Sequence, residues 1–154
     1  MTKLKEGDKA PRFEGTDQNG NLVNSDQYKG KKLVLYFYPK DNTPGCTSEA
    51  CNLRDNYNDF IEKGFEVVGV SADSEKSHKK FAEKHDLPFP LIADTERKIM
   101  TDYGTFGEKK MYGKTFLGIN RATFIISEEG VIEKIFKKVD TKQHTEQIFK
   151  SLQV

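Results

Sequence analysis

The order of apolar segments in the first half of the chain constrains its fold most strongly. Residues 33–38 and 65–71 form two apolar runs with the length and composition of buried β-strands. Between these runs, apolar side chains recur from Cys46 to Ile61 at the spacing of one face of an α-helix, and Gly64 is placed to end that helix. A strand, a helix and a second strand in this order predict a βαβ core.

Shorter segments extend this core in both directions. The Asn19-Gly20 pair is typical of a type I′ turn and predicts a β-hairpin within residues 13–23. Further elements are expected as follows: a helix over residues 74–85, a short strand over 88–93, an antiparallel hairpin formed by 123–127 and 131–137, and a last helix over 141–152. A βαβ core followed by a ββα unit predicts an α/β protein with a thioredoxin-like fold, in which a central mixed sheet carries helices on both faces.

Length and composition limit the possible classes of function. The 154 residues contain no repeat or linker, so one domain over residues 1–154 is expected. With 25 basic and 24 acidic residues the formal net charge is +1, which argues against nucleic-acid binding driven by bulk electrostatics. The longest apolar run is far shorter than the roughly 20 residues of a membrane span, and the N-terminal residues lack the apolar core of a secretory signal. We therefore expect a cytoplasmic protein that binds neither nucleic acid nor membranes.

Cys46 and Cys51 are the only cysteines of the chain. In a reducing compartment, paired cysteines more often carry out redox chemistry or bind a metal than form a structural bridge. A zinc site would need two further ligands, and the histidines do not have the His-x₃₋₅-His spacing typical of such sites. We therefore expect a redox-active pair and no metal or other cofactor.

The spacing of the two cysteines has a geometric consequence if both lie on the predicted helix. Residues five apart on an ideal helix have Cα atoms ~8.6 Å apart, whereas a disulfide bond joins Cα atoms less than about 7 Å apart. A Cys46–Cys51 disulfide would therefore require the helix to unwind locally. This spacing suits a switch between a helical dithiol and an unwound disulfide.

Cys46 lies at the predicted entrance of the helix, after a Thr-Pro-Gly turn. Unpaired backbone N–H groups and the helix dipole favour a negative charge there. They therefore favour the thiolate, which is the nucleophilic form of cysteine. The alternative is a buried, unreactive cysteine that packs as a small hydrophobic side chain, and the position favours the reactive form.

The segment YPKDNTPGCTSEAC resembles the active-site loop of the peroxiredoxins. Pro39, Thr43 and Cys46 have the family's Pro-x-x-x-Thr-x-x-Cys spacing. The second cysteine and the segment GEKKMYGKTFLGINRATFIIS narrow the resemblance to the peroxiredoxin Q, or bacterioferritin comigratory protein, subfamily of atypical 2-Cys peroxiredoxins. GDKAPRFEGTDQNGN, KGKKLVLYFYP and DLPFPLIAD extend it over most of the chain. One difference is Phe106, where the family often has Trp.

The resemblance implies a thiol peroxidase that reduces hydrogen peroxide and organic hydroperoxides, with a role in antioxidant defence and cell redox homeostasis. It makes Cys46 the nucleophile that attacks the distal peroxide oxygen and becomes a sulfenic acid. It makes Cys51 the resolving cysteine, which condenses with this sulfenic acid to an intramolecular disulfide. A thioredoxin-type dithiol reductant then restores both thiols. Since both cysteines lie in one chain, catalysis does not require a dimer, and a monomer is expected.

Four further residues match the family's active site. Thr43 would hydrogen-bond the thiolate and the peroxide through its hydroxyl, and Pro39 would shield the sulfenate. Arg121 would stabilise the thiolate and the charge on the peroxide oxygens, and Glu49 matches a polar position of the substrate site. Without the resemblance each has a simpler interpretation: Thr43 as a loop or capping residue, Glu49 as a solvated or helix-entry carboxylate, Pro39 as the end of a strand and Arg121 as a surface residue.

Three other functions remain open. A thioredoxin-type thiol–disulfide oxidoreductase normally has a Cys-x-x-Cys pair, whereas four residues separate the cysteines here. A non-catalytic redox sensor would react once per reduction instead of turning over. An inert structural disulfide is opposed by the helical spacing of the two cysteines.

Overall fold

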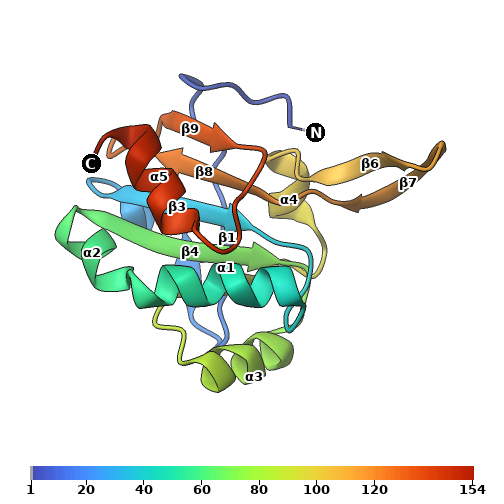
Figure 1. The fold of residues 1–154 in the computed structure, drawn as a ribbon, viewed down its shortest axis with the longest axis horizontal. Coiled ribbons are helices and arrows are strands. Elements are labelled where there is room, and N and C mark those ends of the chain that lie inside the picture. The colour runs from blue at the N-terminus through green and yellow to red at the C-terminus, as the bar shows by residue number, and fades with distance from the viewer. Residues whose placement is uncertain (1) are drawn as a thin grey trace.

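A five-stranded mixed sheet lies at the centre of the computed structural model, which describes residues 2–154 (Figure 1). Its strands follow the order β5-β4-β3-β8-β9. β3 (Lys32–Phe37), β4 (Phe65–Ser71) and β5 (Leu91–Ala93) are parallel to one another. β8 (Ala122–Ile126) pairs antiparallel with β3, and β9 (Ile132–Phe136) pairs antiparallel with β8. The predicted mixed sheet and its C-terminal hairpin are confirmed.

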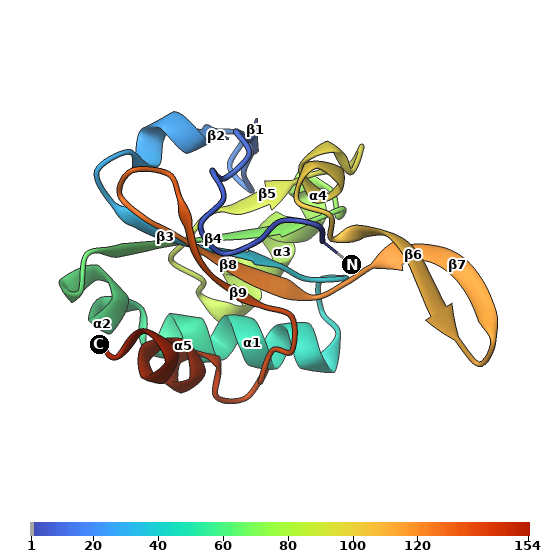
Figure 2. The ribbon, with the colours of Figure 1, turned by 90° about the horizontal axis from the view of Figure 1, so that it is seen from above.

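Four helices bury apolar side chains against one face of this sheet. They are α1 (Pro44–Asp55), α2 (Tyr57–Glu62), α3 (Glu75–His85) and α5 (His144–Leu152). Figure 2 shows α1 and α5 on this side of the sheet. Both cysteines of the chain lie on α1 and therefore on this side of the sheet, and Cys46 belongs to the buried cluster.

The opposite face is covered by a second apolar cluster. It lies under α4 (Lys98–Asp102), the N-terminal hairpin of β1 (Glu14–Thr16) and β2 (Leu22–Asn24), and the 3₁₀ helix η1 (Ser25–Tyr28). Figure 2 shows α4, β1 and β2 across the sheet from α1. The thioredoxin-like arrangement of helices on both faces is confirmed, although α4 was not among the predicted helices.

The N-terminal hairpin is present, but its turn differs from the predicted type I′ turn. A type I′ turn needs positive φ at both central residues. Gly20 has a φ of +75°, whereas Asn19 does not have a positive φ. The carboxylate of Asp17 organises the loop instead, because its Oδ1 accepts hydrogen bonds from the backbone N–H groups of Asn19 (2.8 Å) and Asn21 (3.0 Å).

The single helix predicted from Cys46 to Ile61 is wrong in its C-terminal part, where the chain forms two helices. α1 ends at Asp55, and Asn56 (φ −111°, ψ 12°) separates it from α2. The Asn56 side chain donates a hydrogen bond to the carbonyl of Asn52 (2.8 Å), one of the local bonds through which Asn competes with the helical backbone. With this break, Ile61 falls outside the buried stripe and is 42% exposed.

The remaining predicted elements are confirmed with small changes at their ends. α3 begins after Ser74, whose side chain accepts a hydrogen bond from the Ser77 N–H group (3.1 Å) and caps the helix. β5 is shorter than predicted because Pro88 and Pro90 have no N–H group to donate to a neighbouring strand. α5 begins at His144 instead of residue 141. Within residues 2–154 no helix has both the length and the apolar character to cross a membrane.

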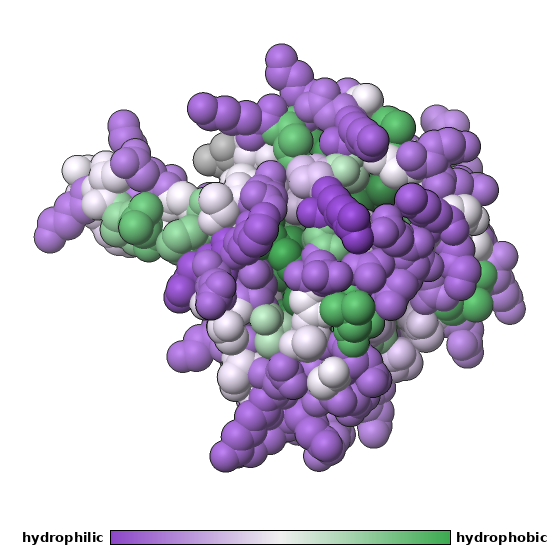
Figure 3. Space-filling model, turned by 180° about the vertical axis from the view of Figure 1, so that it is seen from behind, coloured by the Kyte–Doolittle hydropathy of each residue, from purple (hydrophilic) through white to green (hydrophobic). Residues whose placement is uncertain are grey.

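A second hairpin, which was not predicted, projects from the body of the molecule in both ribbon views (Figures 1 and 2). It consists of β6 (Phe106–Met111) and β7 (Lys114–Ile119). Tyr112 at its tip is 97% exposed and has a φ of 54°. Hydrophobic side chains of this hairpin are visible at the surface (Figure 3). The hairpin leads from α4 back to Arg121 at the start of β8.

Candidate active site

Cys46 lies in the first turn of α1, on the side that packs against the sheet. Its side chain is 1% exposed and belongs to the same apolar cluster as Val34 of β3 and Ala50 of α1. Thr43 is the N-cap residue, and Pro44 begins the helix at a position where the missing N–H group of proline costs nothing. The loop after β3 therefore delivers a buried thiol to the N-terminus of a helix.

Arg121 lies beside Cys46, although 75 positions separate the two residues in the sequence. The antiparallel pairing of β8 with β3 brings the start of β8, next to Arg121, to the end of β3, where the loop to Cys46 begins. Arg121 Nη2 donates a hydrogen bond to Cys46 Sγ (3.2 Å), and Arg121 Nη1 donates one to Glu49 Oε1 (2.6 Å). The guanidinium therefore bridges the thiol sulfur and a carboxyl group one turn further along α1.

Gly45 gives this guanidinium room. A Cβ atom at position 45 would lie 3.1 Å from Arg121 Nη2, which is tighter than nine in ten Cβ contacts in proteins. A larger residue would therefore require the guanidinium to give way by a few tenths of an ångström. The glycine before Cys46 therefore allows the close approach of Arg121.

Glu49 is completely buried, so its charge depends on its neighbours. Burial raises the pKa of Glu49 to about 7, against the opposing effect of the adjacent Arg121 guanidinium. Near neutral pH the ionised and protonated forms of this carboxyl group are therefore both populated. Within the described part of the chain its second oxygen, Oε2, has no hydrogen-bond partner, and it lies 3.6 Å from His144 Nε2.

His144, the first residue of α5, is a buried neighbour of the site that the sequence analysis missed. Its Nδ1 lies 2.9 Å from Gln147 Oε1, and its Nε2 lies 2.8 Å from Thr123 Oγ1. Gln147 Oε1 also accepts from the Asp140 N–H group (3.0 Å), which identifies it as the amide oxygen. Nδ1 of His144 therefore carries the ring proton and Nε2 accepts from Thr123. Burial lowers the pKa of His144 to about 4, so the ring is neutral at neutral pH.

Thr43 and Pro39, two other predicted site residues, lie in the loop that leads to Cys46. Thr43 Oγ1 donates a hydrogen bond to the carbonyl of Lys40 (2.8 Å). Within residues 2–154 no hydrogen bond joins Thr43 to Cys46. Pro39 is half-buried and follows the last residue of β3 by two positions. The expected roles of Thr43 and Pro39 stay predictions.

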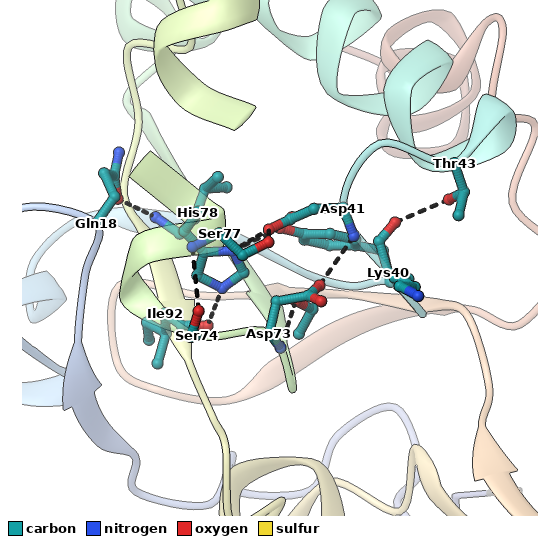
Figure 4. Close-up of polar contacts among 12 residues, drawn as sticks. Gln18, Lys40, Asp41, Thr43, Asp73, Ser74, Ser77, His78 and Ile92 are labelled. Carbon is teal, nitrogen blue, oxygen red and sulfur yellow. Dashed lines mark hydrogen bonds and ion pairs between the residues drawn. The ribbon is translucent and has the colours of Figure 1, made fainter. Parts of the chain in front are cut away.

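A buried polar network fixes the first part of this loop (Figure 4). Asp41 Oδ2 lies 2.7 Å from His78 Nδ1 and accepts a hydrogen bond from Ser77 Oγ (2.8 Å). His78 Nε2 donates to the carbonyl of Ile92 (2.9 Å), and the Asp41 N–H group donates to Asp73 Oδ2 (2.8 Å). These contacts tie the loop before Cys46 to α3 and to the ends of β4 and β5.

The ligand atoms of Asp41, Asp73 and His78 lie within 4.8 Å of one another, a spacing that a cation could bridge. These atoms already have protein partners, however. Asp41 Oδ1 accepts from the Tyr38 hydroxyl (2.7 Å), and Asp73 Oδ2 also accepts from Ser71 Oγ (2.7 Å). The cluster therefore anchors the loop, and we assign no metal to it.

Cys51 lies further along α1, between this helix and α3. It is half-buried, and its Sγ lies 3.8 Å from Nδ1 of His85, the last residue of α3. Both cysteines are free thiols, and α1 includes both of them. A bond between Cys46 and Cys51 therefore requires α1 to unwind. The neighbours of Cys51 were not identified from the sequence, because the helices that meet there are far apart along the chain.

Comparison with known proteins agrees with this geometry. The AhpC/TSA family model matches residues 6–135. Peroxiredoxin Bcp of Bacillus subtilis (strain 168) is 46% identical over 146 residues, which cover 95% of this chain and 93% of that protein. Peroxiredoxin Bcp of Escherichia coli (strain K12) is 42% identical over 144 residues, which cover 94% of this chain and 92% of that protein.

Solved structures give the same result. Xanthomonas campestris peroxiredoxin Q superposes with a TM-score of 0.86 at 36% identity, over 92% of this chain and 89% of that one. A structure concerned with the alkyl peroxide reduction activity of Xanthomonas campestris bacterioferritin comigratory protein has a TM-score of 0.86 at 35% identity, over 92% and 90% of the two chains. A mutant of Xylella fastidiosa PrxQ has a TM-score of 0.91 at 30% identity, over 99% and 98%. The chain therefore belongs to the AhpC/TSA family, among the peroxiredoxins of the Bcp and peroxiredoxin Q type, and is a thiol peroxidase.

Proposed function

We propose that Cys46 is the peroxidatic nucleophile of a thioredoxin-dependent peroxiredoxin that reduces hydrogen peroxide and organic hydroperoxides. The observation that carries this proposal is the contact of the Arg121 guanidinium with Cys46 Sγ at 3.2 Å, in a buried site at the N-terminus of α1. A fixed cation beside the sulfur and the positive end of the helix dipole both favour the thiolate. The thiolate is the form of cysteine that attacks a peroxide.

In the first step the Cys46 thiolate attacks the distal oxygen of the hydroperoxide and the O–O bond breaks. The sulfur becomes a sulfenic acid, and the leaving oxygen takes a proton to form water or an alcohol. Negative charge moves from sulfur to oxygen in the transition state, where the guanidinium of Arg121 stabilises it. Glu49 positions this guanidinium through the 2.6 Å contact with Nη1.

Thr43 and Pro39 complete the proposed site. The Thr43 hydroxyl already donates its hydrogen to the Lys40 carbonyl, so its oxygen lone pairs are the groups that can accept a hydrogen bond from a hydroperoxide O–H. Such a bond would orient the substrate without moving the loop. Pro39 would shield the sulfenate from water.

In the second step Cys51 resolves the sulfenic acid. A bond forms between the two sulfur atoms, the S–O bond breaks, and the hydroxyl group leaves as water after it takes a proton. This step needs α1 to unwind around Cys51, where the segment is held by bonds such as Asn52 Nδ2 to the Lys142 carbonyl (3.0 Å). A thioredoxin-type dithiol then reduces the disulfide by thiol–disulfide exchange, and α1 forms again.

We also propose that the enzyme is a cytoplasmic monomer with one domain over residues 1–154, and that it needs no metal or other cofactor. Because both cysteines lie in one chain, a second copy is not required for resolution. The alkyl peroxide reduction described for the Xanthomonas campestris protein supports organic hydroperoxides as substrates here. Antioxidant defence is the role that this chemistry serves.

The proposal is tested by mixing fully reduced protein with one equivalent of hydrogen peroxide and following the loss of thiols, with free cysteine as the reference. We expect both thiols to disappear orders of magnitude faster than the reference, with an intramolecular disulfide as the product in mass spectrometry. Loss of thiols at the rate of free cysteine would contradict the assignment.

Two further assays separate the alternatives. An oxidoreductase of thioredoxin type would reduce insulin disulfides, whereas we expect no appreciable insulin reduction by this enzyme. A redox sensor would consume one equivalent of peroxide and stop, whereas a peroxidase consumes peroxide continuously when thioredoxin, its reductase and NADPH are present.

A further inference from the structure

The surroundings of Cys51 contain a base and a cation that the steps above do not use. His85 Nδ1 lies 3.8 Å from Cys51 Sγ, within hydrogen-bonding distance for sulfur. The Arg54 guanidinium approaches the same place, because its Nη1 donates a hydrogen bond to the His85 carbonyl (2.8 Å). An imidazole nitrogen therefore lies beside the thiol that must act as the second nucleophile, and the guanidinium of Arg54 is bonded to the backbone of the same histidine.

Neighbouring residues hold both side chains in this orientation. The His85 ring packs edge-on against Phe81, with centroids 5.2 Å apart and an interplanar angle of 74°. Arg54 is held by hydrogen bonds from Nε (3.0 Å) and Nη2 (2.9 Å) to Asp55 Oδ1. The contact between Cys51 and His85 is therefore a defined feature of the interface between α1 and α3.

The charges around the ring favour its neutral form. Burial lowers the pKa of His85, as do the positive charges of Lys84 and Arg54, while Asp86 acts in the opposite direction. In a neutral imidazole one nitrogen carries a proton and the other can accept one. For the Cys51 thiol to donate its proton in this contact, Nδ1 must be the acceptor and Nε2 must carry the ring proton.

We propose that His85 is the catalytic base of the resolving step, which takes the Cys51 thiol proton on Nδ1 while Arg54 stabilises the thiolate. This inference rests on the proposed function, in which Cys51 resolves the sulfenic acid on Cys46. The proton moves from Cys51 Sγ to His85 Nδ1, the thiolate forms the S–S bond with Cys46, and the S–O bond breaks. The departing hydroxide takes a proton from solvent to become water, and His85 afterwards returns its proton to solvent. One sulfenic acid and one thiol give one disulfide and one water, with no further oxidant.

The order of events follows from the geometry. The contact between Cys51 and His85 exists only while this part of α1 is helical, because both residues are held at the interface with α3. Proton transfer to His85 therefore has to begin before this part of α1 unwinds.

The first experiment measures Cys51 alone, in full-length protein in which Cys46→Ser leaves it as the only thiol. The rate of its alkylation by iodoacetamide is followed between pH 5 and pH 10, because the thiolate is the reactive form. Three proteins are compared: Cys46→Ser alone, Cys46→Ser with His85→Ala, and Cys46→Ser with Glu83→Ala, a change of an exposed residue of α3. We expect His85→Ala to lower the alkylation rate at pH 7 relative to the rate at pH 10, where the thiol ionises without a base, and Glu83→Ala to leave this ratio of rates unchanged.

The pH profile separates chemistry from packing. Removal of the imidazole also uncovers Cys51, which raises the alkylation rate at every pH without changing the ratio of the rates at pH 7 and pH 10. The same ratio in all three proteins would overturn the proposal. An equal change of the ratio with Glu83→Ala and with His85→Ala would also overturn it, because the effect would then come from a general change in α3.

The second experiment follows the resolving step in protein that contains both cysteines. After one equivalent of peroxide, rapid acid quench and mass spectrometry distinguish the sulfenic acid from the disulfide. We expect His85→Ala to slow disulfide formation roughly tenfold or more at pH 7, and the difference to shrink at alkaline pH, where the thiol ionises without a base. An unchanged rate at pH 7 would overturn the role of His85. A parent protein that forms no intramolecular disulfide would instead overturn the proposed role of Cys51, so the two failures are distinguishable.

Discussion

The two thiols of α1 lie in unlike surroundings, although they are only five positions apart in the sequence. Cys46 is 1% exposed and is contacted by a guanidinium that arrives from the start of β8. Cys51 is half-buried and is contacted by an imidazole at the end of α3. The partner of Cys46 is itself held in place, since Arg121 Nη1 is bonded to the buried Glu49 carboxyl group at 2.6 Å. The partners of Cys51 lie near the surface.

This difference matches the different tasks of the two thiols. The peroxidatic sulfur must meet its substrate in a preassembled site, which needs a rigid loop and a fixed cation. The resolving sulfur must leave its place, which needs a segment of low local stability. Apart from the buried Leu53, the second half of α1 is held to α3 and α5 by hydrogen bonds such as those of Arg54 to His85 and of Asn52 to Thr145. One helix therefore combines a rigid first turn with a second half that can be released.

Cys46→Ser tests whether the buried thiol in the first turn of α1 is the one that reacts with peroxide. Without the sulfur nucleophile, peroxide consumption should fall by a factor on the order of 10⁴ or more, as for removal of a nucleophile in other enzymes. The measurement is steady-state NADPH oxidation with thioredoxin and its reductase at fixed peroxide. Cys51 remains in this variant as an internal control, so appreciable turnover would show that the buried thiol is not the one that reacts with peroxide.

Arg121→Gln tests whether the guanidinium is what distinguishes the first site. The change removes the donors to Cys46 Sγ and Glu49, so the rate of the reaction with peroxide should fall about 10²- to 10³-fold, as for loss of a donor that stabilises transition-state charge. The second-order rate constant of thiol loss measures this directly. Arg121→Lys keeps a positive charge but cannot contact both partners in the same geometry, so its rate should lie between those of Arg121→Gln and the parent.

The matched control for Arg121 is Arg12→Gln, which removes an exposed arginine paired with Asp26 on the opposite face of the sheet. Its rate with peroxide should equal that of the parent. A loss with Arg12→Gln as large as the loss with Arg121→Gln would mean that overall charge, and not the local contact, controls the reaction.

Cys51→Ser tests whether the thiol in the second half of α1 resolves the sulfenic acid. The first equivalent of peroxide should still oxidise Cys46, but turnover with thioredoxin should drop on the order of tenfold or more, since no intramolecular disulfide is available for exchange. Excess peroxide should then carry the sulfenic acid on to the sulfinic acid, which mass spectrometry detects as a gain of a second oxygen. Normal turnover in this variant would place the resolving thiol on another molecule.

Most of the fold could be predicted because it depends on local patterns. The apolar runs of β3 and β4 and the periodicity of α3 each identify an element within a dozen residues. The errors arise where a single polar side chain competes with the regular backbone, as Asn56 does between α1 and α2 and Asp17 does in the first hairpin. The projecting β6–β7 hairpin was missed because much of its surface is exposed, so hydrophobic alternation gives little signal there.

The candidate site could be predicted only where its residues share one segment. Cys46 and Cys51 lie close together in the sequence, so their position and spacing indicate redox chemistry, whereas Thr43 was identified through the resemblance to a family. Arg121 was identified through resemblance to a family, because its contact with Cys46 depends on the pairing of β8 with β3. His144 could not be found at all, since its position follows from the packing of α5 beside Glu49 and no local pattern marks it.

Variants of Glu49 and His144 test which of these two residues beside Cys46 carries a proton in the folded and in the unfolded protein. Their expected effect, a change in how stability depends on pH, is the smallest. Burial raises the pKa of Glu49 from 4.5 to about 7 and lowers that of His144 from 6.5 to about 4. Between about pH 4.5 and pH 6.5 the folded site therefore holds one proton on Glu49, and the unfolded chain holds one on His144. Because both states bind the same number of protons, this pair gives no slope of stability with pH in that window.

Each single substitution should expose one of the two opposing slopes. In His144→Asn the folded state alone binds the proton on Glu49, so stability should fall as pH rises from about 4.5 to 7, by up to about 1.4 kcal/mol per pH unit relative to the parent. In Glu49→Gln the unfolded state alone binds the proton on His144, so stability should fall as pH drops from about 6.5 to 4. Urea unfolding at a series of pH values measures both, and the double variant should have the slope of the parent again. If the stability of the parent and of both single variants depended on pH in the same way, folding would not move this proton from His144 to Glu49.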